Sequence, residues 1–166
     1  MGEWRVKNIA LCGILFIFIT VSFAGCVSDS SSYKDDEFVE WADFTVSIVE
    51  QYARWESDYM DEGRWGKARH WAYANMDDFA ARLFTMRTEY TDGLSSDGVC
   101  LFNAMERYLV NMSKVSLHHH HAAMWFENFG DDDKRGLDEL DEAEGYEKRV
   151  TMHLSEVKVY IYQLSS

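Results

Sequence analysis

The chain has 166 residues, of which 16 are basic and 29 are acidic, and its formal net charge at pH 7 is −13. The basic residues are scattered singly among carboxylates, whereas a surface that binds nucleic acid needs clustered lysine and arginine. The same negative charge opposes adsorption onto anionic lipid headgroups. We therefore expect no nucleic acid partner and regard cations as the more suitable small ligands.

The first 26 residues have the composition of an export signal. Arg5 and Lys7 precede an apolar run over residues 9–24, and Cys26 directly follows the small residue Gly25. A basic start, an apolar middle and small residues before the cleavage point are typical of secretory signals. Because a cysteine follows the small residues at once, the segment resembles a prokaryotic lipoprotein signal, in which the cysteine is lipidated and becomes the new N-terminus.

Two alternatives to lipidation at Cys26 remain open for this leader. The uncharged run over residues 9–27 is near the lower limit of about 17–25 residues for a transmembrane helix, so the leader could stay as an anchor. Simple cleavage and secretion is the other alternative. We predict a signal peptide or membrane anchor over residues 1–25, a flexible polar tether over 26–36, and one folded domain over 37–166. This domain is expected outside the cytoplasm, anchored to the membrane by its N-terminus.

The chain after residue 36 is predicted to be helical throughout. It has no proline, and no run alternates apolar and polar residues over the length of a strand. Apolar residues instead recur at spacings of three and four in segments of about 36–60, 64–91, 99–128 and 137–164. Because short loops join these segments, we expect an all-α domain, an antiparallel up-down-up-down four-helix bundle.

The helical spacing also predicts which residues form the core. For the first helix it selects Phe38, Trp41, Thr45, Ile48, Tyr52, Trp55 and Tyr59. For the third it selects Leu101, Met105, Tyr108, Met112, Val115, His119, Ala122 and Phe126, and the fourth stripe starts at Leu137. Cys100 is the one cysteine outside the leader and the lipidation position, so we expect a buried, unpaired thiol.

Four consecutive histidines, residues 118–121, form an unusual tract in the third helix. Because a helix turns about 100° per residue, only His118 and His121 can chelate one ion together, while His119 faces the core. Histidine-rich tracts do bind metal. The alternatives are therefore purely structural histidines or a surface site for Zn²⁺, Ni²⁺ or Cu²⁺.

An acidic loop precedes the fourth helix. Counted from Asp131, oxygen ligands fall on Asp133, Glu139 and Glu142, and Gly136 takes the glycine position. This spacing resembles a degenerate EF-hand loop, which would bind Ca²⁺. The alternative is an acidic connector that caps the fourth helix. Separately, Asn111 begins an Asn-Met-Ser glycosylation pattern inside the third predicted helix.

No catalytic arrangement can be assigned from the spacing of nucleophiles, bases and acids, and no glycine-rich phosphate loop occurs. The Glu-x-x-His pattern of di-iron bundles is also missing. We therefore expect a non-enzymatic binding or scaffold module of the cell envelope, which requires no cofactor and binds an envelope protein or a small ligand. The spaced tryptophans are candidates for a ligand pocket or partner surface. The alternative function is a metal-binding surface lipoprotein.

Overall fold

The computed structural model describes residues 33–166, and this part of the chain is helical with no strand. Its elements are α2 (Tyr33–Asp61), α3 (Trp65–Glu89), α4 (Ser96–Phe129) and α5 (Lys134–Leu164). The prediction of an all-α domain with four helices is therefore confirmed for these residues. Residues 1–25, Cys26 and most of the expected tether lie outside the described part. Within residues 33–166, no helix is both long enough and apolar enough to cross a bilayer.

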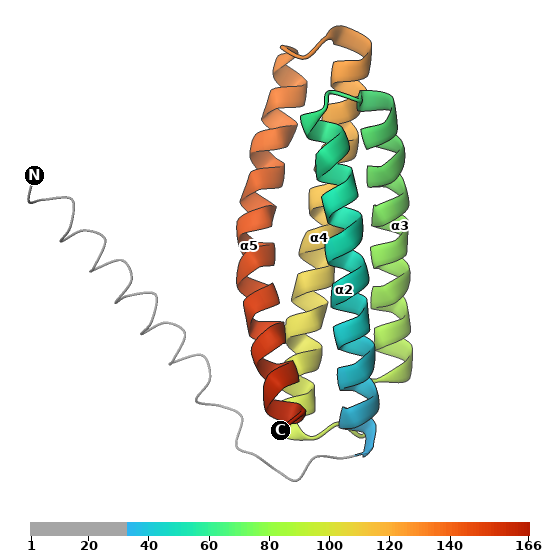
Figure 1. Ribbon diagram of the computed structural model, residues 1–166, viewed down its shortest axis with the longest axis vertical. Coiled ribbons are helices and arrows are strands. Elements are labelled where there is room, and N and C mark those ends of the chain that lie inside the picture. Colours follow the sequence, from blue (N-terminus) through green and yellow to red (C-terminus); the bar gives the residue numbers. More distant parts are fainter. Residues whose placement is uncertain (1–32) are drawn as a thin grey trace, which may run out of the picture.

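The four helices lie side by side in a bundle (Figure 1). The turn at Gly63 and the loop before α5 lie at one end, and the loop before α4 and the C-terminus lie at the other (Figure 1). α4 contacts all three other helices and packs most closely against α5 and α3. This central position agrees with its burial, because α4 has more buried residues than α2, α3 or α5.

The first turn of α2 is held against the neighbouring helices. The buried Asp35 accepts a hydrogen bond from the Ser95 backbone N–H at 3.0 Å, and Lys34 Nζ lies 3.5 Å from the Glu89 carbonyl oxygen. These contacts join the start of α2 to the end of α3 and the start of α4. They explain why α2 begins at Tyr33, within the segment that the sequence predicts as tether.

The turns follow from a few local residues. Gly63 and Gly130 adopt φ values of +65° and +99°, in the region that favours glycine, and each follows the end of a helix. Asp133 caps α5 by accepting a hydrogen bond from the Arg135 backbone N–H at 3.0 Å. Because of this cap, α5 begins at Lys134, three residues before its predicted start.

The predicted core is confirmed in α4, where all eight residues of the stripe are buried. In the other stripes, the prediction of a core position is wrong for two residues, because Trp55 is 37% exposed and Leu137 is 46% exposed. The buried face of α2 is formed by Phe38, Ala42, Thr45, Val46, Val49, Glu56 and Met60. This face contains the small side chains of Ala42, Val46 and Val49, while the rings of Trp41 and Tyr52 are only partly buried against the core.

The expectation for Cys100 is wrong in part. Its side chain is half-buried against the main core, as expected of a small hydrophobe. The residue is disulfide-bonded, however. The spacing of cysteines in a sequence does not identify disulfide partners, so this bond could not be predicted from the sequence.

Candidate functional site

A cluster of buried polar side chains lies inside the bundle. Glu56 of α2, whose side chain is 2% exposed, receives hydrogen bonds from three residues on two other helices. Asn75 Nδ2 of α3 lies 2.6 Å from its Oε2, Ser116 Oγ of α4 lies 2.8 Å from the same oxygen, and His119 Nδ1 lies 2.7 Å from Oε1. We call these four residues the Glu56 cluster.

The Glu56 cluster supplies hydrogen-bond donors to a buried carboxylate, but its residues are not in the order of a catalytic triad. In hydrolases with a serine nucleophile, the imidazole takes the serine proton and the acid orients the imidazole. Here Ser116 and His119 both bind the carboxylate of Glu56, so the acid stands between them. A buried carboxylate needs such partners to offset the loss of water. The cluster therefore links α2, α3 and α4 through hydrogen bonds to one buried carboxylate.

His119 is the titratable member whose pKa departs from its ordinary value. Burial lowers the pKa of this imidazole, but the hydrogen bond to Glu56 and the charges of Glu56, Glu147 and Asp61 together raise the pKa above 6.5. Glu147 Oε1 of α5 lies 3.7 Å from His119 Nε2. Carboxylates of α2 and α5 thus stabilise the protonated ring from both sides.

We expect the stability of the bundle to fall as the pH rises above neutrality. Because the folded pKa of His119 exceeds its unfolded value, the stabilisation is complete below about pH 6.5 and is lost as the pH rises through the folded pKa. Urea unfolding at about pH 6 and about pH 9 measures the change. A His119→Gln variant should lose most of this dependence. If both proteins respond equally, the assignment to His119 is wrong.

The structure brings His118 and His121 to a common carboxylate. Glu139 Oε2 of α5 lies 2.7 Å from His118 Nδ1 and 3.6 Å from His121 Nδ1. His119 faces the core as predicted, and His120 Nδ1 lies 3.1 Å from the Arg69 carbonyl oxygen. Across residues 33–166, no three or more His, Cys, Asp or Glu side chains are already arranged as a metal site. The sequence suggested Glu139 as a ligand of the acidic loop, whereas the structure places it beside the two histidines.

The residues of the acidic loop make separate contacts. Asp131 Oδ1 accepts a hydrogen bond from Trp65 Nε1 at 2.7 Å, and Asp133 pairs with Arg135 at 2.8 Å besides capping α5. Glu142 lies within α5, nine residues beyond Asp133, which corresponds to about 13 Å along the helix. The structure therefore does not bring Glu142 to the two aspartates, because the helix starts too early for the loop to wrap around an ion.

Asn111, the glycosylation candidate, lies in the middle of α4. Its Nδ2 donates a hydrogen bond to the Arg107 carbonyl oxygen of the same helix at 2.7 Å. Glycosylation acceptors usually stand in surface loops. The structure therefore places this asparagine in a setting unlike the usual acceptor.

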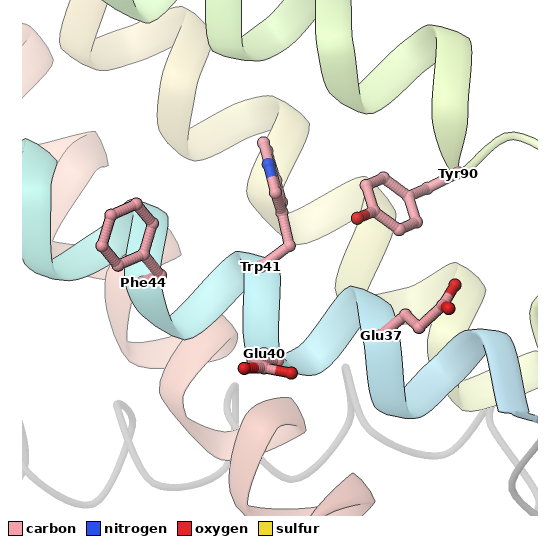
Figure 2. A pocket seen from close by; sticks show the side chains of 5 residues that line it. All are labelled: Glu37, Glu40, Trp41, Phe44 and Tyr90. Carbon is pink, nitrogen blue, oxygen red and sulfur yellow. The ribbon is translucent and has the colours of Figure 1, made fainter.

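An open hollow of about 500 Å³ lies where α2 begins and α3 ends, and we call it the aromatic pocket. Its lining consists of Glu37, Glu40, Trp41, Phe44 and Tyr90. Figure 2 shows Trp41 projecting from α2 between Phe44 and Tyr90, with the two glutamates along the same helix. Ligand pockets generally occupy about 300–1,000 Å³. The volume of this hollow lies in that range, and its lining combines three aromatic rings with two carboxylates, although it is wide open to solvent.

The rings of the aromatic pocket are supported by the core. The centroids of Trp41 and Tyr90 are 5.6 Å apart, and the buried Phe38 lies 4.9 Å from Tyr90 and 5.9 Å from Trp41. Phe44 is different, because it is 61% exposed and belongs to the rim. Two rings are therefore held in fixed positions while a third faces solvent.

The aromatic pocket carries negative charge. Burial raises the pKa of the Tyr90 hydroxyl, and the charges of Glu89, Glu37 and Glu40 raise it further. Neither Glu37 nor Glu40 forms an ion pair with another residue of the described chain. Carboxylate charge therefore remains available to a ligand beside the exposed ring faces.

Sequence reasoning finds this pocket only in part. Trp41 is one of the spaced tryptophans that are candidates for a ligand pocket, but its place in the apolar stripe assigns it to the core. The available signal was the pair of glutamates on the same face as Trp41 and Phe44, at spacings of three and four, but the ring of Tyr90 comes from another helix. The chain matches no family model, no curated protein and no solved structure with which it was compared.

Proposed function

We propose that this chain is an extracytoplasmic lipoprotein, anchored through Cys26, whose helical domain is a non-enzymatic binding module of the cell envelope. Lipidation uses the Cys26 sulfur and cleavage removes Cys12, so in this mature form the disulfide of Cys100 would not join it to another cysteine of the same chain. The observation that carries the binding role is the aromatic pocket, a hollow of about 500 Å³ with two supported rings and two carboxylates that lack ion-pair partners in the described chain. The Glu56 cluster supports a role without catalysis, because its carboxylate separates Ser116 from His119 and the imidazole is not placed to take the serine proton.

The anchor and the pocket are expected at the same end of the domain. We propose an antiparallel up-down-up-down order of the helices, supported by the short loops at alternate ends of the bundle (Figure 1). A tether that ends at the start of α2 would hold this end near the membrane surface. Glu37 and Phe44 lie in the first four turns of α2, so the pocket would lie near the lipid headgroups.

A panel of small ligands tests the binding role. The probes are tetramethylammonium, acetate and benzyl alcohol, added to the full-length chain in a maltoside detergent and followed by the NMR signal of the Trp41 indole N–H. A Trp41→Phe variant identifies that signal. We expect at least one chemical class to shift it in a saturable manner, with weaker binding in Phe44→Ala. If no class moves the signal, the aromatic pocket is not a binding site.

Metal binding is the second candidate, and the contact of Glu139 with both His118 and His121 favours it. Imidazole and carboxylate groups from two helices are suitable ligands for Zn²⁺ and similar ions. Small side-chain rotations would be needed to surround an ion. Such a site would join α4 to α5, and the metal would add to the stability of the domain.

We expect Zn²⁺ to raise the melting temperature of the full-length chain if this second function is correct. A ligand that binds only the folded state stabilises it by about 2.7 kcal/mol at one hundred times its Kd. The rise should disappear in a His118→Ala, His121→Ala double variant and persist in His70→Ala, since His70 is an exposed histidine of α3. An unchanged melting temperature at millimolar Zn²⁺ would eliminate this function.

A further inference from the structure

We infer that the aromatic pocket binds an organic ammonium group, such as a quaternary or alkylated amine, and not an inorganic cation. This inference rests on the proposed binding function and specifies its ligand class. It combines three features of the pocket: negative charge, aromatic rings in its lining, and the lack of a compact set of oxygen ligands.

The charge of the pocket favours a cation. Glu37 and Glu40 stand one turn apart on α2, and Glu89 adds a third charge near Tyr90. Lys34, the basic residue in the preceding turn, is directed to the Glu89 carbonyl oxygen at 3.5 Å. Carboxylates near the start of α2 also interact favourably with its helix dipole. Glu40 lies beyond the first turn, so the dipole alone does not account for it.

The rings favour an organic cation. Trp41 and Tyr90 have centroids 5.6 Å apart at an interplanar angle of 41°, so their faces do not stack flat on each other. Cations bind to such faces through the ring quadrupole, most strongly to tryptophan. Methyl or methylene groups around an ammonium nitrogen also gain apolar contact with the rings, including the exposed Phe44.

Inorganic cations fit the same residues poorly. Ca²⁺ takes six to eight oxygen ligands, and Mg²⁺ requires a near-octahedral set. The pocket lining provides only the carboxylates of Glu37 and Glu40 and the Tyr90 hydroxyl. A diffuse organic charge loses less hydration free energy than a compact ion when it enters a hollow with apolar walls.

A matched pair of ligands tests the inference. Choline and its neutral isostere 3,3-dimethylbutan-1-ol have the same shape, so they differ only in charge. We expect choline to shift the Trp41 indole signal of the full-length chain in maltoside detergent, with a Kd on the order of 1 mM for so open a site. The neutral isostere should bind at least tenfold more weakly. NaCl or MgCl₂, added to the same ionic strength as the choline salt, should not shift the Trp41 signal.

Matched variants locate the binding. Glu40→Gln and Glu37→Gln should each weaken choline binding roughly three- to tenfold, and Phe44→Ala should weaken it similarly. Asp43→Asn is the control, because Asp43 is an exposed carboxylate of α2 outside the lining. Tyr90→Phe keeps the ring and should retain binding. If Asp43→Asn weakens binding as much as Glu40→Gln, only the general charge of the helix acts and the inference is wrong.

The remaining outcomes separate this inference from the proposed function. Equal binding of choline and the neutral isostere would overturn the ammonium specificity while the binding function stands. Failure of every probe class at Trp41 would overturn both. Nanodiscs of phosphatidylcholine and of phosphatidylglycerol distinguish the source of the group. If the Trp41 signal lies at its choline-bound position in phosphatidylcholine nanodiscs but not in phosphatidylglycerol nanodiscs, the ligand is a lipid headgroup. If the signal lies at its unbound position in both lipids and shifts when choline is added, the ligand is a free molecule.

Discussion

Replacing Glu56 with alanine is expected to lower the free energy of unfolding by about 3–5 kcal/mol. The substitution leaves Asn75, Ser116 and His119 without the carboxylate that all three contact. Unsatisfied buried polar groups carry the full penalty of their lost hydration. Urea denaturation followed by circular dichroism measures the effect at a pH near 6, where the histidine is protonated in the wild-type chain.

Two variants control this experiment. Glu50→Ala removes a glutamate of the same helix whose ion pair with Lys158 is exposed, so we expect a loss of less than about 1 kcal/mol. Glu56→Gln keeps an acceptor for Asn75 and Ser116 and should be less destabilising than Glu56→Ala. If Glu56→Ala costs no more than Glu50→Ala, the Glu56 cluster does not hold the three helices together.

Alanine at Gly136 is expected to destabilise the domain by about 1–3 kcal/mol. A Cβ atom at this position would overlap the ring of Phe126, which is 4% exposed and lies against Trp65 with a centroid distance of 4.7 Å. The gain in helix propensity from glycine to alanine, about 1 kcal/mol, does not offset such an overlap. Thermal or urea unfolding of the variant measures the net effect.

Gly145 provides the matched control, because it lies in the same helix and a Cβ atom added there would have no neighbouring atom within 4 Å. Gly145→Ala should therefore stabilise the domain by about 0.5–1 kcal/mol. The Gly136→Ala penalty should also disappear in a Phe126→Ala background, since the methyl group then occupies vacated space. Equal effects of alanine at both glycines would show that Phe126 does not pack on Gly136.

The number and approximate limits of the helices could be predicted because they depend on local spacing. Apolar residues at intervals of three and four mark each helix, and glycine marks its end near residues 63 and 130. α4 was predicted best because its stripe is continuous and contacts every other helix. The prediction for α2 is wrong at Trp55. Aromatic residues at helical spacing resemble core residues, whereas Ala42 and Val46 are the small side chains that let α2 approach its neighbours.

The candidate sites could be predicted only in part, because they join residues from different helices. The tract at residues 118–121 indicated that His119 faces inward, and the structure agrees. Its partner Glu56 lies 63 positions away in the sequence, and no local pattern marks a buried glutamate. The same limit applies to Glu139, which contacts His118, and to Tyr90, which completes the aromatic pocket.

The most direct test of the anchored binding module is the mass of the N-terminal peptide from membrane fractions of a bacterial host that expresses the full chain. We predict a chain that starts at Cys26 and carries the mass of attached lipid, and a Cys26→Ser variant that lacks this modification. An unmodified Met1 on protein from the cytosolic fraction would contradict the account.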